Sequence, residues 1–245
     1  MRKPAFRLIC IPCAGGSASY FLKWASVFPP QVKLHGLHLP GREERFDEPL
    51  PISLTELTAR LVDEIQPLFD LPFAIFGHSI GALVGFELAR HLRRKHLPQP
   101  ALLIASGLRA PHLISTLKPA TELQEHDFLH WLAQLNGTPR NLLADDDAIR
   151  VFLPVIRADM MLATSYLYEA EPALRCSLSA YGGLSDAGTD RQQLLGWKQH
   201  TAGKFRLRMF PGGHFFTDTV RALVCESILT DIAEACEEGG AACFR

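Results

Sequence analysis

The chain has 245 residues, of which 47% are hydrophobic and 21% charged, and its formal net charge is −1. That length and balance suit a single globular α/β domain with a sizeable buried core, and the small net charge gives no electrostatic basis for binding nucleic acid. The apolar runs are short and interrupted, well below the ~20 apolar residues that a membrane helix needs, so no membrane partner is expected.

The N-terminus is basic, but it leads into a short apolar strand pattern at 6–11 rather than into the apolar stretch of a signal peptide. We therefore expect a cytoplasmic protein whose six cysteines are reduced thiols. Cys10 and Cys13 have the spacing of a redox or half-zinc motif, yet no second such pair follows. Packed, inert thiols are the better interpretation, and no metal is expected.

The first half of the chain alternates strand and helix patterns. Strands are predicted at 6–11 and 32–39, with a helix at about 18–28 that ends at two prolines. Ser53 and Glu56 have the spacing of a capping box, which starts an amphipathic helix. The loop that follows the first strand contains a glycine pair, but it matches neither a dinucleotide-binding pattern nor a phosphate-binding loop.

The sequence Gly-His-Ser-Ile-Gly at 77–81 follows an apolar strand at 73–76 and leads directly into a helical pattern. Strand, Gly-x-Ser-x-Gly and helix in this order are typical of the nucleophile elbow of an α/β-hydrolase. The residues two before and two after the serine must be small for the sharp turn to close. The turn would place the Ser79 hydroxyl at the positive end of the following helix, where a developing anion is favoured.

After a further buried strand at 101–106, the alternation stops between 111 and 172. This segment has helical patterns and is most simply a helical lid inserted over the strand ends. Within it, Phe152, Met160 and Met161 are candidates for lining an acyl channel.

Strands at 174–181 and 205–210 and a terminal helix from about 218 complete the pattern. Six strands, each followed by a helix or the lid, predict an α/β-hydrolase fold with a mostly parallel, doubly wound sheet. We expect one domain, 1–245, with the lid at about 111–172.

A serine hydroxyl needs a general base, and hydrolases of this fold place the partners in the order Ser, acid, His. His214 follows the last strand within a glycine-rich loop and is the best-placed of the ten histidines. His78 is expected to pack and form hydrogen bonds inside the turn. Asp186 follows the preceding strand and is the preferred acid; Asp190 is the alternative, although helix capping explains it better. The predicted triad is Ser79, Asp186 and His214.

An oxyanion in this fold is held by two backbone N–H groups, one from the residue after the nucleophile and one from an early strand-to-helix loop. Ile80 is the first predicted donor. Ala14 is the preferred second donor, with Cys13 as the alternative. This set supports acyl transfer to water without a metal or organic cofactor.

Several ordered motifs resemble the stand-alone type II thioesterases of nonribosomal peptide and polyketide synthesis, and the likeness covers nearly the whole chain. The motifs occupy 11–18, 39–43, 77–82, 153–159, 181–186, 197–201 and 210–216. The resemblance implies the same Ser79, Asp186 and His214 triad. It also implies the substrate, namely acyl groups stalled on the phosphopantetheine arm of a carrier protein.

The partner would then be an acyl or peptidyl carrier protein domain, and we expect the chain to be a monomer. Arg42 and Arg45, or the basic end of the elbow helix, are candidates for meeting this acidic partner. Two other functions stay open at this stage. One is a small-molecule carboxylesterase, and the other is a non-catalytic protein that docks on a synthase.

Overall fold

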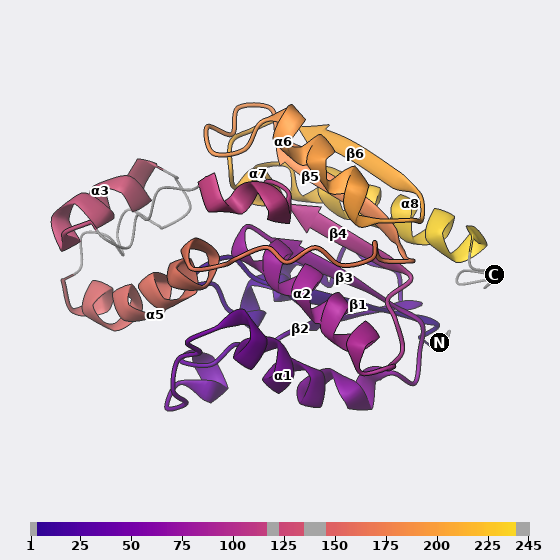
Figure 1. The fold of residues 1–245 in the computed structure, drawn as a ribbon, viewed down its shortest axis with the longest axis horizontal. Coiled ribbons are helices and arrows are strands. Elements are labelled where there is room, and N and C mark those ends of the chain that lie inside the picture. The colour runs from indigo at the N-terminus through magenta and orange to yellow at the C-terminus, as the bar shows by residue number, and fades with distance from the viewer. Residues whose placement is uncertain (1–3, 117–122, 135–145, 239–245) are drawn as a thin grey trace.

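A computed structural model describes residues 4–116, 123–134 and 146–238. Its centre is a six-stranded sheet with the strand order β2-β1-β3-β4-β5-β6, and every neighbouring pair is parallel (Figure 1). The strands are β1 (Phe6–Ile11), β2 (Val32–Gly36), β3 (Phe73–His78), β4 (Leu102–Ser106), β5 (Ser177–Gly183) and β6 (Phe205–Phe210). The predicted parallel, doubly wound sheet is therefore confirmed. Its carboxyl edge is where such folds carry their sites.

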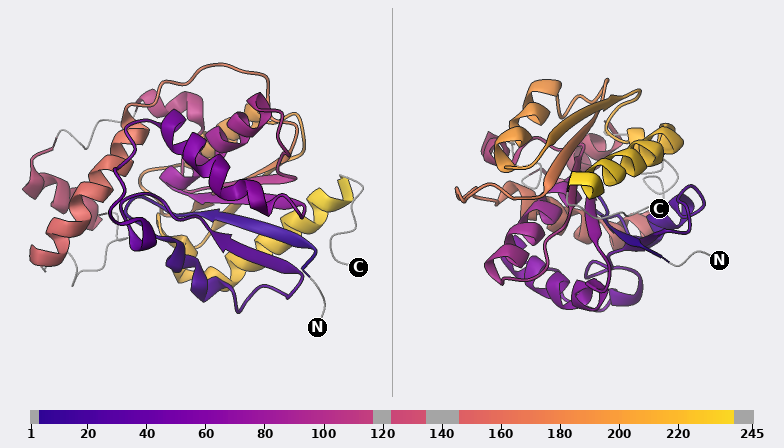
Figure 2. Two further views of the ribbon diagram at one scale, coloured as in Figure 1. Left: turned by 90° about the horizontal axis from the view of Figure 1, so that it is seen from below. Right: turned by 90° about the vertical axis from the view of Figure 1, so that its right-hand side faces the viewer.

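Helices cover both faces of the sheet, as the two views of Figure 2 show. The main α-helices of the two layers are α1 (Leu54–Ile65), α2 (Ile80–Arg94), α6 (Arg191–Leu195) and α8 (Arg221–Glu238). Successive residues of β1 alternate between the layers: Ile9 and Ile11 pack on the side of α1, α2 and α6, whereas Leu8 and Cys10 pack on the side of α8. This alternation is the two-residue period of a strand that is buried on both faces.

Three helical segments differ from the sequence prediction in type or extent. The segment predicted as a helix at 18–28 is a 3₁₀ helix, η1 (Ala18–Trp24). It packs so closely on β2 that a Cβ at Gly36 would lie 2.8 Å from the Ala18 carbonyl oxygen. The helix predicted to follow the strand at 174–181 is the short α6, which continues as a 3₁₀ turn, η6 (Gly196–His200). The terminal helix is preceded by a separate short helix, α7 (Phe216–Thr219), because Val220 has non-helical dihedral angles.

The segment 111–172 contains η4 (Pro111–Thr116), α3 (Glu125–Gln134) and α5 (Asp146–Thr164), which includes Pro154. Helices α3 and α5 project beyond the carboxyl end of the sheet, far from both termini (Figure 1). Thr121 and Gln124 have the spacing of a capping box in the sequence, but Thr121 lies outside the described residues. The function of this segment as a lid stays a prediction.

The cysteines depart from expectation at one position. Cys10, Cys13, Cys176 and Cys225 are free thiols, whereas Cys236 is disulfide-bonded. The prediction that all six thiols are reduced is therefore wrong for Cys236, and Cys243 lies outside the described residues. None of the helices in the described ranges is both long and apolar enough to span a membrane.

Candidate active site

The turn between β3 and α2 has the geometry that its sequence predicts. Ser79 has φ 56° and ψ −126°, a conformation that non-glycine residues rarely adopt and that costs about 1–3 kcal/mol. A Cβ at Gly77 would lie 2.0 Å from the Gly81 carbonyl oxygen, and one at Gly81 would lie 2.4 Å from the Ile11 carbonyl oxygen. Both glycines are therefore required by close backbone contacts. The neighbouring strand holds the turn, because the Ser79 N–H donates to the Ser106 carbonyl at 2.7 Å.

The three side chains predicted as a triad form one hydrogen-bonded chain. His214 Nδ1 lies 2.9 Å from Asp186 Oδ2, and His214 Nε2 lies 3.0 Å from Ser79 Oγ. An ionised carboxylate only accepts hydrogen bonds, so His214 Nδ1 carries the proton in a neutral imidazole. Nε2 is then the acceptor, and the Ser79 hydroxyl donates to it. This is the tautomer that a general base for the serine requires.

The loops after β5 and β6 bring the acid and the base together. A Cβ at Gly183 would lie 2.2 Å from the Gly213 carbonyl oxygen, so the two loops approach backbone to backbone. The Asp186 side chain is 1% exposed, and its other oxygen, Oδ1, accepts a hydrogen bond from the Gly188 N–H at 2.8 Å. Each carboxylate oxygen therefore has one donor, and the orientation of the carboxylate is fixed.

The alternative acid, Asp190, is not part of this chain of hydrogen bonds. Its side chain accepts from the Gln193 N–H at 2.8 Å, and the Gln193 side chain accepts from the Asp190 N–H at 3.0 Å. This reciprocal pair is a capping box at the start of α6. Helix capping accounts for Asp190 in full.

His78 is buried beside the site and bonds to Ser106, with 2.9 Å between Nδ1 and Oγ. Its ring centroid lies 5.3 Å from that of His214. Burial, followed by the neighbouring His214, holds the pKa of His78 well below its usual value. His78 is thus a neutral packing residue at physiological pH, as the sequence indicated, and it adds no positive charge next to His214.

The two predicted oxyanion donors belong to α2 and to the loop after β1, and these segments are in close contact, since a Cβ at Gly81 would lie 2.5 Å from the Pro12 carbonyl oxygen. Ile80 is the first residue of α2, and the first N–H groups of a helix have no partner within the helix. In the loop after β1, the Gly15 N–H donates to Asp159 and the Gly16 N–H donates to the Cys13 carbonyl. Before Gly15, the N–H groups of that loop belong to Cys13 and Ala14, because Pro12 has none, and these are the two residues that the sequence left as alternatives.

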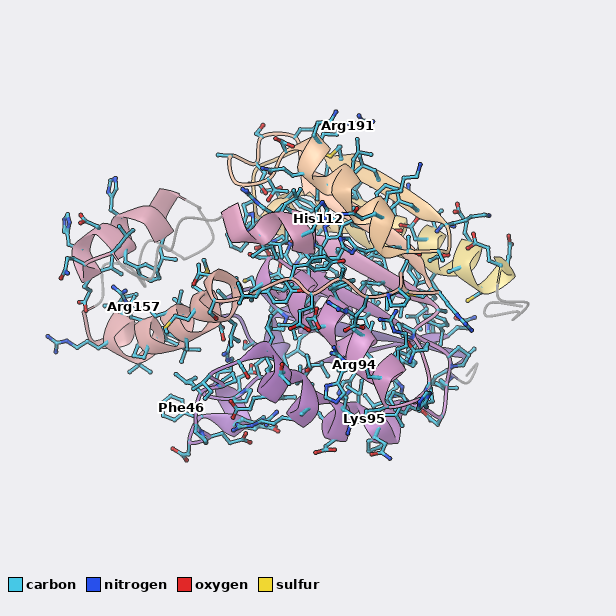
Figure 3. The ribbon with its side chains drawn as sticks, viewed as in Figure 1. Phe46, Arg94, Lys95, His112, Arg157 and Arg191 are labelled. Carbon is cyan, nitrogen blue, oxygen red and sulfur yellow. The ribbon has the colours of Figure 1, made fainter. Side chains whose placement is uncertain are left out.

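The hypothesis that Arg42 meets a partner protein is wrong. Its side chain is 5% exposed and forms a two-point ion pair with Asp159. Arg45 is partly exposed, but its guanidinium already pairs with Glu48 and Glu64. At the basic end of α2, labelled at Arg94 and Lys95 in Figure 3, Arg94 pairs with Glu171. Most of these cations have carboxylate partners within the chain.

The apolar residues of α5 divide into two groups. Met160 packs against a small cluster formed by α3 and α5 that includes Phe128, Leu132 and Ile156. The side chain of Phe152 is 40% exposed and that of Met161 is 56% exposed. Figure 3 shows Arg157 on the same helix, well outside the sheet. A role for these apolar residues in binding an acyl chain stays a prediction.

Two residues at the site had no role in the sequence prediction. Ser106 holds both His78 and the backbone of Ser79, and Asp159 reaches the loop after β1 from α5. The position of Ser106 at the end of a strand next to the elbow strand was a usable signal. For Asp159, the only sequence signal was its place in the family motif at 153–159. Within the described ranges, no group of three or more His, Cys, Asp or Glu side chains is arranged to hold a metal ion.

Comparison with known proteins identifies the family of the chain. The thioesterase domain family matches residues 6–235. The gramicidin S biosynthesis protein GrsT of Aneurinibacillus migulanus is 40% identical over 210 residues, which are 86% of this chain and 82% of GrsT.

Two solved structures are similar over almost their whole length. ClbQ from the colibactin nonribosomal peptide and polyketide pathway has a TM-score of 0.89 at 29% identity, covering 94% of this chain and 98% of ClbQ. The type II thioesterase BorB from the borrelidin biosynthetic cluster has a TM-score of 0.84 at 33% identity, covering 96% of this chain and 95% of BorB. The chain therefore belongs to the thioesterase family and is a thioester hydrolase.

Proposed function

We propose that this protein is a type II, editing thioesterase that removes aberrant or stalled acyl groups from the phosphopantetheine arm of carrier proteins in nonribosomal peptide or polyketide synthesis. The observation that carries the chemistry is the continuous chain from Ser79 through His214 to Asp186, at 3.0 and 2.9 Å. The similarity to ClbQ from the colibactin nonribosomal peptide and polyketide pathway, to the type II thioesterase BorB and to the gramicidin S biosynthesis protein GrsT supports the biological role.

In the proposed first half-reaction, Ser79 Oγ forms a bond to the thioester carbonyl carbon while its proton passes to His214 Nε2. The carbonyl oxygen becomes an oxyanion, held by the N–H groups of Ile80 and Ala14. Collapse of the tetrahedral intermediate breaks the carbon–sulfur bond. The proton on His214 goes to the leaving sulfur, so free phosphopantetheine thiol departs and an acyl ester remains on Ser79.

In the second half-reaction, water replaces the thiol. The water oxygen bonds to the acyl carbon while His214 Nε2 accepts a proton from that water. His214 then returns the proton to Ser79 Oγ as the ester bond breaks. The products are the free acid and the unchanged enzyme. Asp186 keeps the imidazole in the correct tautomer and stabilises the imidazolium, but takes no proton itself.

A substrate preference separates this function from that of a small-molecule carboxylesterase. The same acyl group should be offered on a holo carrier protein, on N-acetylcysteamine and as an ethyl ester. We expect kcat/KM to fall in that order. Carrier contacts favour the first substrate over the second, and the thiol leaving group favours both thioesters over the ethyl ester. Fastest turnover of the ethyl ester would favour the carboxylesterase. Absence of turnover on all three would favour a non-catalytic docking protein.

A further inference from the structure

The loop that follows β1 is held by a buried ion pair from two distant parts of the chain. Asp159 of α5 and Arg42 form two hydrogen bonds, at 2.7 and 2.8 Å, and their side chains are 4% and 5% exposed. Asp159 Oδ2 also accepts from the Gly15 N–H at 2.8 Å, and Arg42 donates to the Gly16 carbonyl at 3.1 Å. The pair therefore holds the loop at two backbone groups, the Gly15 N–H and the Gly16 C=O.

The same turn of α5 contacts this loop through an apolar side chain. Gly15 has φ +67°, and a Cβ there would lie 2.4 Å from Cγ1 of Ile156. Ala14 packs against the cluster that contains Ile156. Polar and apolar contacts from one helical turn thus hold the peptide groups next to the predicted oxyanion donor.

These contacts also determine which donors stay available. Because Asp159 takes the Gly15 N–H and the Cys13 carbonyl takes the Gly16 N–H, neither glycine can serve an oxyanion in this conformation. Without an acceptor at Asp159, the Gly15 N–H would need another partner, and the peptide planes on either side of Ala14 would be free to turn. An oxyanion donor that turns away loses its effect, because the stabilisation depends on preorganised geometry.

We propose that Asp159, held by Arg42, is a positioning residue that fixes the loop after β1 so that the Ala14 N–H points at the developing oxyanion. This inference rests on the proposed roles of Ser79 and Ala14. It gives the turn of α5 that carries Ile156 and Asp159 a part in positioning the oxyanion donor. It also explains why an arginine next to the loop is buried and paired inside the protein.

The test separates positioning from stability with two variants. One should lose kcat but keep its stability, and the other should lose stability but keep most of its kcat. Arg42→Met/Asp159→Leu replaces the buried pair by apolar side chains, an exchange that often preserves stability, but it leaves the Gly15 N–H without its acceptor. Asp159→Asn keeps an acceptor oxygen for Gly15 but leaves Arg42 buried without a counter-charge, which is destabilising. Each variant is measured by urea unfolding and by kcat and KM on an acylated carrier protein at 15 °C.

For the double variant we expect a native-like unfolding midpoint, a kcat lowered about 100-fold and a KM within about threefold, since one oxyanion donor is worth about 10²–10³ in kcat. For Asp159→Asn we expect a lowered midpoint but a kcat loss of no more than about tenfold. The matched control is Arg208→Met/Asp231→Leu. It removes a second arginine–aspartate pair whose aspartate is fully buried, away from the loop, and it should keep kcat within about twofold.

A second readout reports the oxyanion site directly. An alkylboronic acid binds when Ser79 Oγ bonds to boron and its proton passes to His214, which gives a tetrahedral, negatively charged adduct with an oxygen at the oxyanion position. The double variant should bind it about 100-fold more weakly, matching the loss in kcat. If kcat and boronate affinity follow the unfolding midpoint across all variants, the pair is merely structural and the proposal is overturned.

Failure of the proposed function would look different. If the native protein binds the boronate but hydrolyses no carrier thioester, the proposed substrate is wrong. The boronate affinities of the variants then decide the role of Asp159 on their own: a selective loss in the double variant supports positioning, and unchanged affinity refutes it.

Discussion

Replacing Asp186 by asparagine should invert the hydrogen bonding of the proposed triad without changing its shape. In the native protein Asp186 Oδ1 accepts from the Gly188 N–H at 2.8 Å, and Oδ2 accepts from His214 Nδ1 at 2.9 Å. Asparagine has one acceptor and one donor in these places. The Gly188 N–H requires the acceptor on its side, so the amide NH₂ must face His214 Nδ1. The imidazole then carries its proton on Nε2, the atom 3.0 Å from Ser79 Oγ, and cannot accept the serine proton.

The size of the effect follows from this change of tautomer. We expect kcat on an acylated carrier protein to fall about 10⁴-fold, which corresponds to about 5.5 kcal/mol in the activation barrier. KM should stay within about threefold, because no substrate contact is removed. The unfolding midpoint should change little, since the amide keeps both hydrogen bonds and almost the same volume.

The assay is single-turnover and steady-state hydrolysis of an acylated holo carrier protein. Asp190→Asn is the matched control: the residue lies four positions away and caps α6 through Gln193, so its kcat should stay within about twofold of native. A loss of less than about tenfold for Asp186→Asn would refute the tautomer argument. Equal losses for the two variants would refute the assignment of Asp186 as the acid.

Three further predictions follow from other contacts. Gly77→Ala should cost about 3 kcal/mol or more of the free energy of unfolding, since its Cβ would lie 2.0 Å from the Gly81 carbonyl oxygen; a urea midpoint close to native would contradict the elbow geometry. Burial and then the nearby His112 lower the pKa of His200 to about 4. Between about pH 6.5 and 4 this histidine therefore binds a proton in the unfolded chain but not in the folded one, and the free energy of unfolding should fall as the pH drops through that range. His200→Gln should flatten that fall in urea titrations, and an unchanged slope would refute the assignment. Burial, then the Asp159 charge, raises the pKa of the Cys13 thiol to about 12, so iodoacetamide at pH 8 should label it about 100-fold more slowly in the folded than in the unfolded protein, as read by peptide mass spectrometry. Comparable labelling rates would show that this thiol is accessible and ionisable.

Local patterns in the sequence were sufficient for the sheet and for the candidate site. The central strands of a parallel sheet are short apolar runs, and the run at 73–76 corresponds to β3. The edge strand β6 is only half-buried, and it alternates apolar residues with arginines at 205–209. The topology of the fold brings the site residues together, because residues 79, 186 and 214 each follow a strand and the carboxyl ends of parallel strands share one edge. The hydrogen-bonded chain among them was therefore foreseeable in kind.

Features that depend on distant contacts were not foreseeable. The pair of Arg42 and Asp159 joins positions 117 residues apart, so Arg42 resembles a surface loop residue in the sequence although it is buried. The segment at 18–24 has helical composition, but it forms a 3₁₀ helix in close contact with β2. The strand predicted from 174 begins as β5 only at Ser177, because Leu174 pairs through a single bridge with Thr201.

The central claim is that Ser79 attacks an acyl group carried by a phosphopantetheine arm. Its most direct test is intact-protein mass spectrometry of a holo carrier protein loaded with acetyl or a longer acyl group, incubated with the native enzyme or with Ser79→Ala. We predict that the acyl mass is lost with the native enzyme and retained with Ser79→Ala. Loss of the acyl mass at the native rate with Ser79→Ala would contradict the role of Ser79. Retention of the acyl group with both proteins would contradict the proposed substrate.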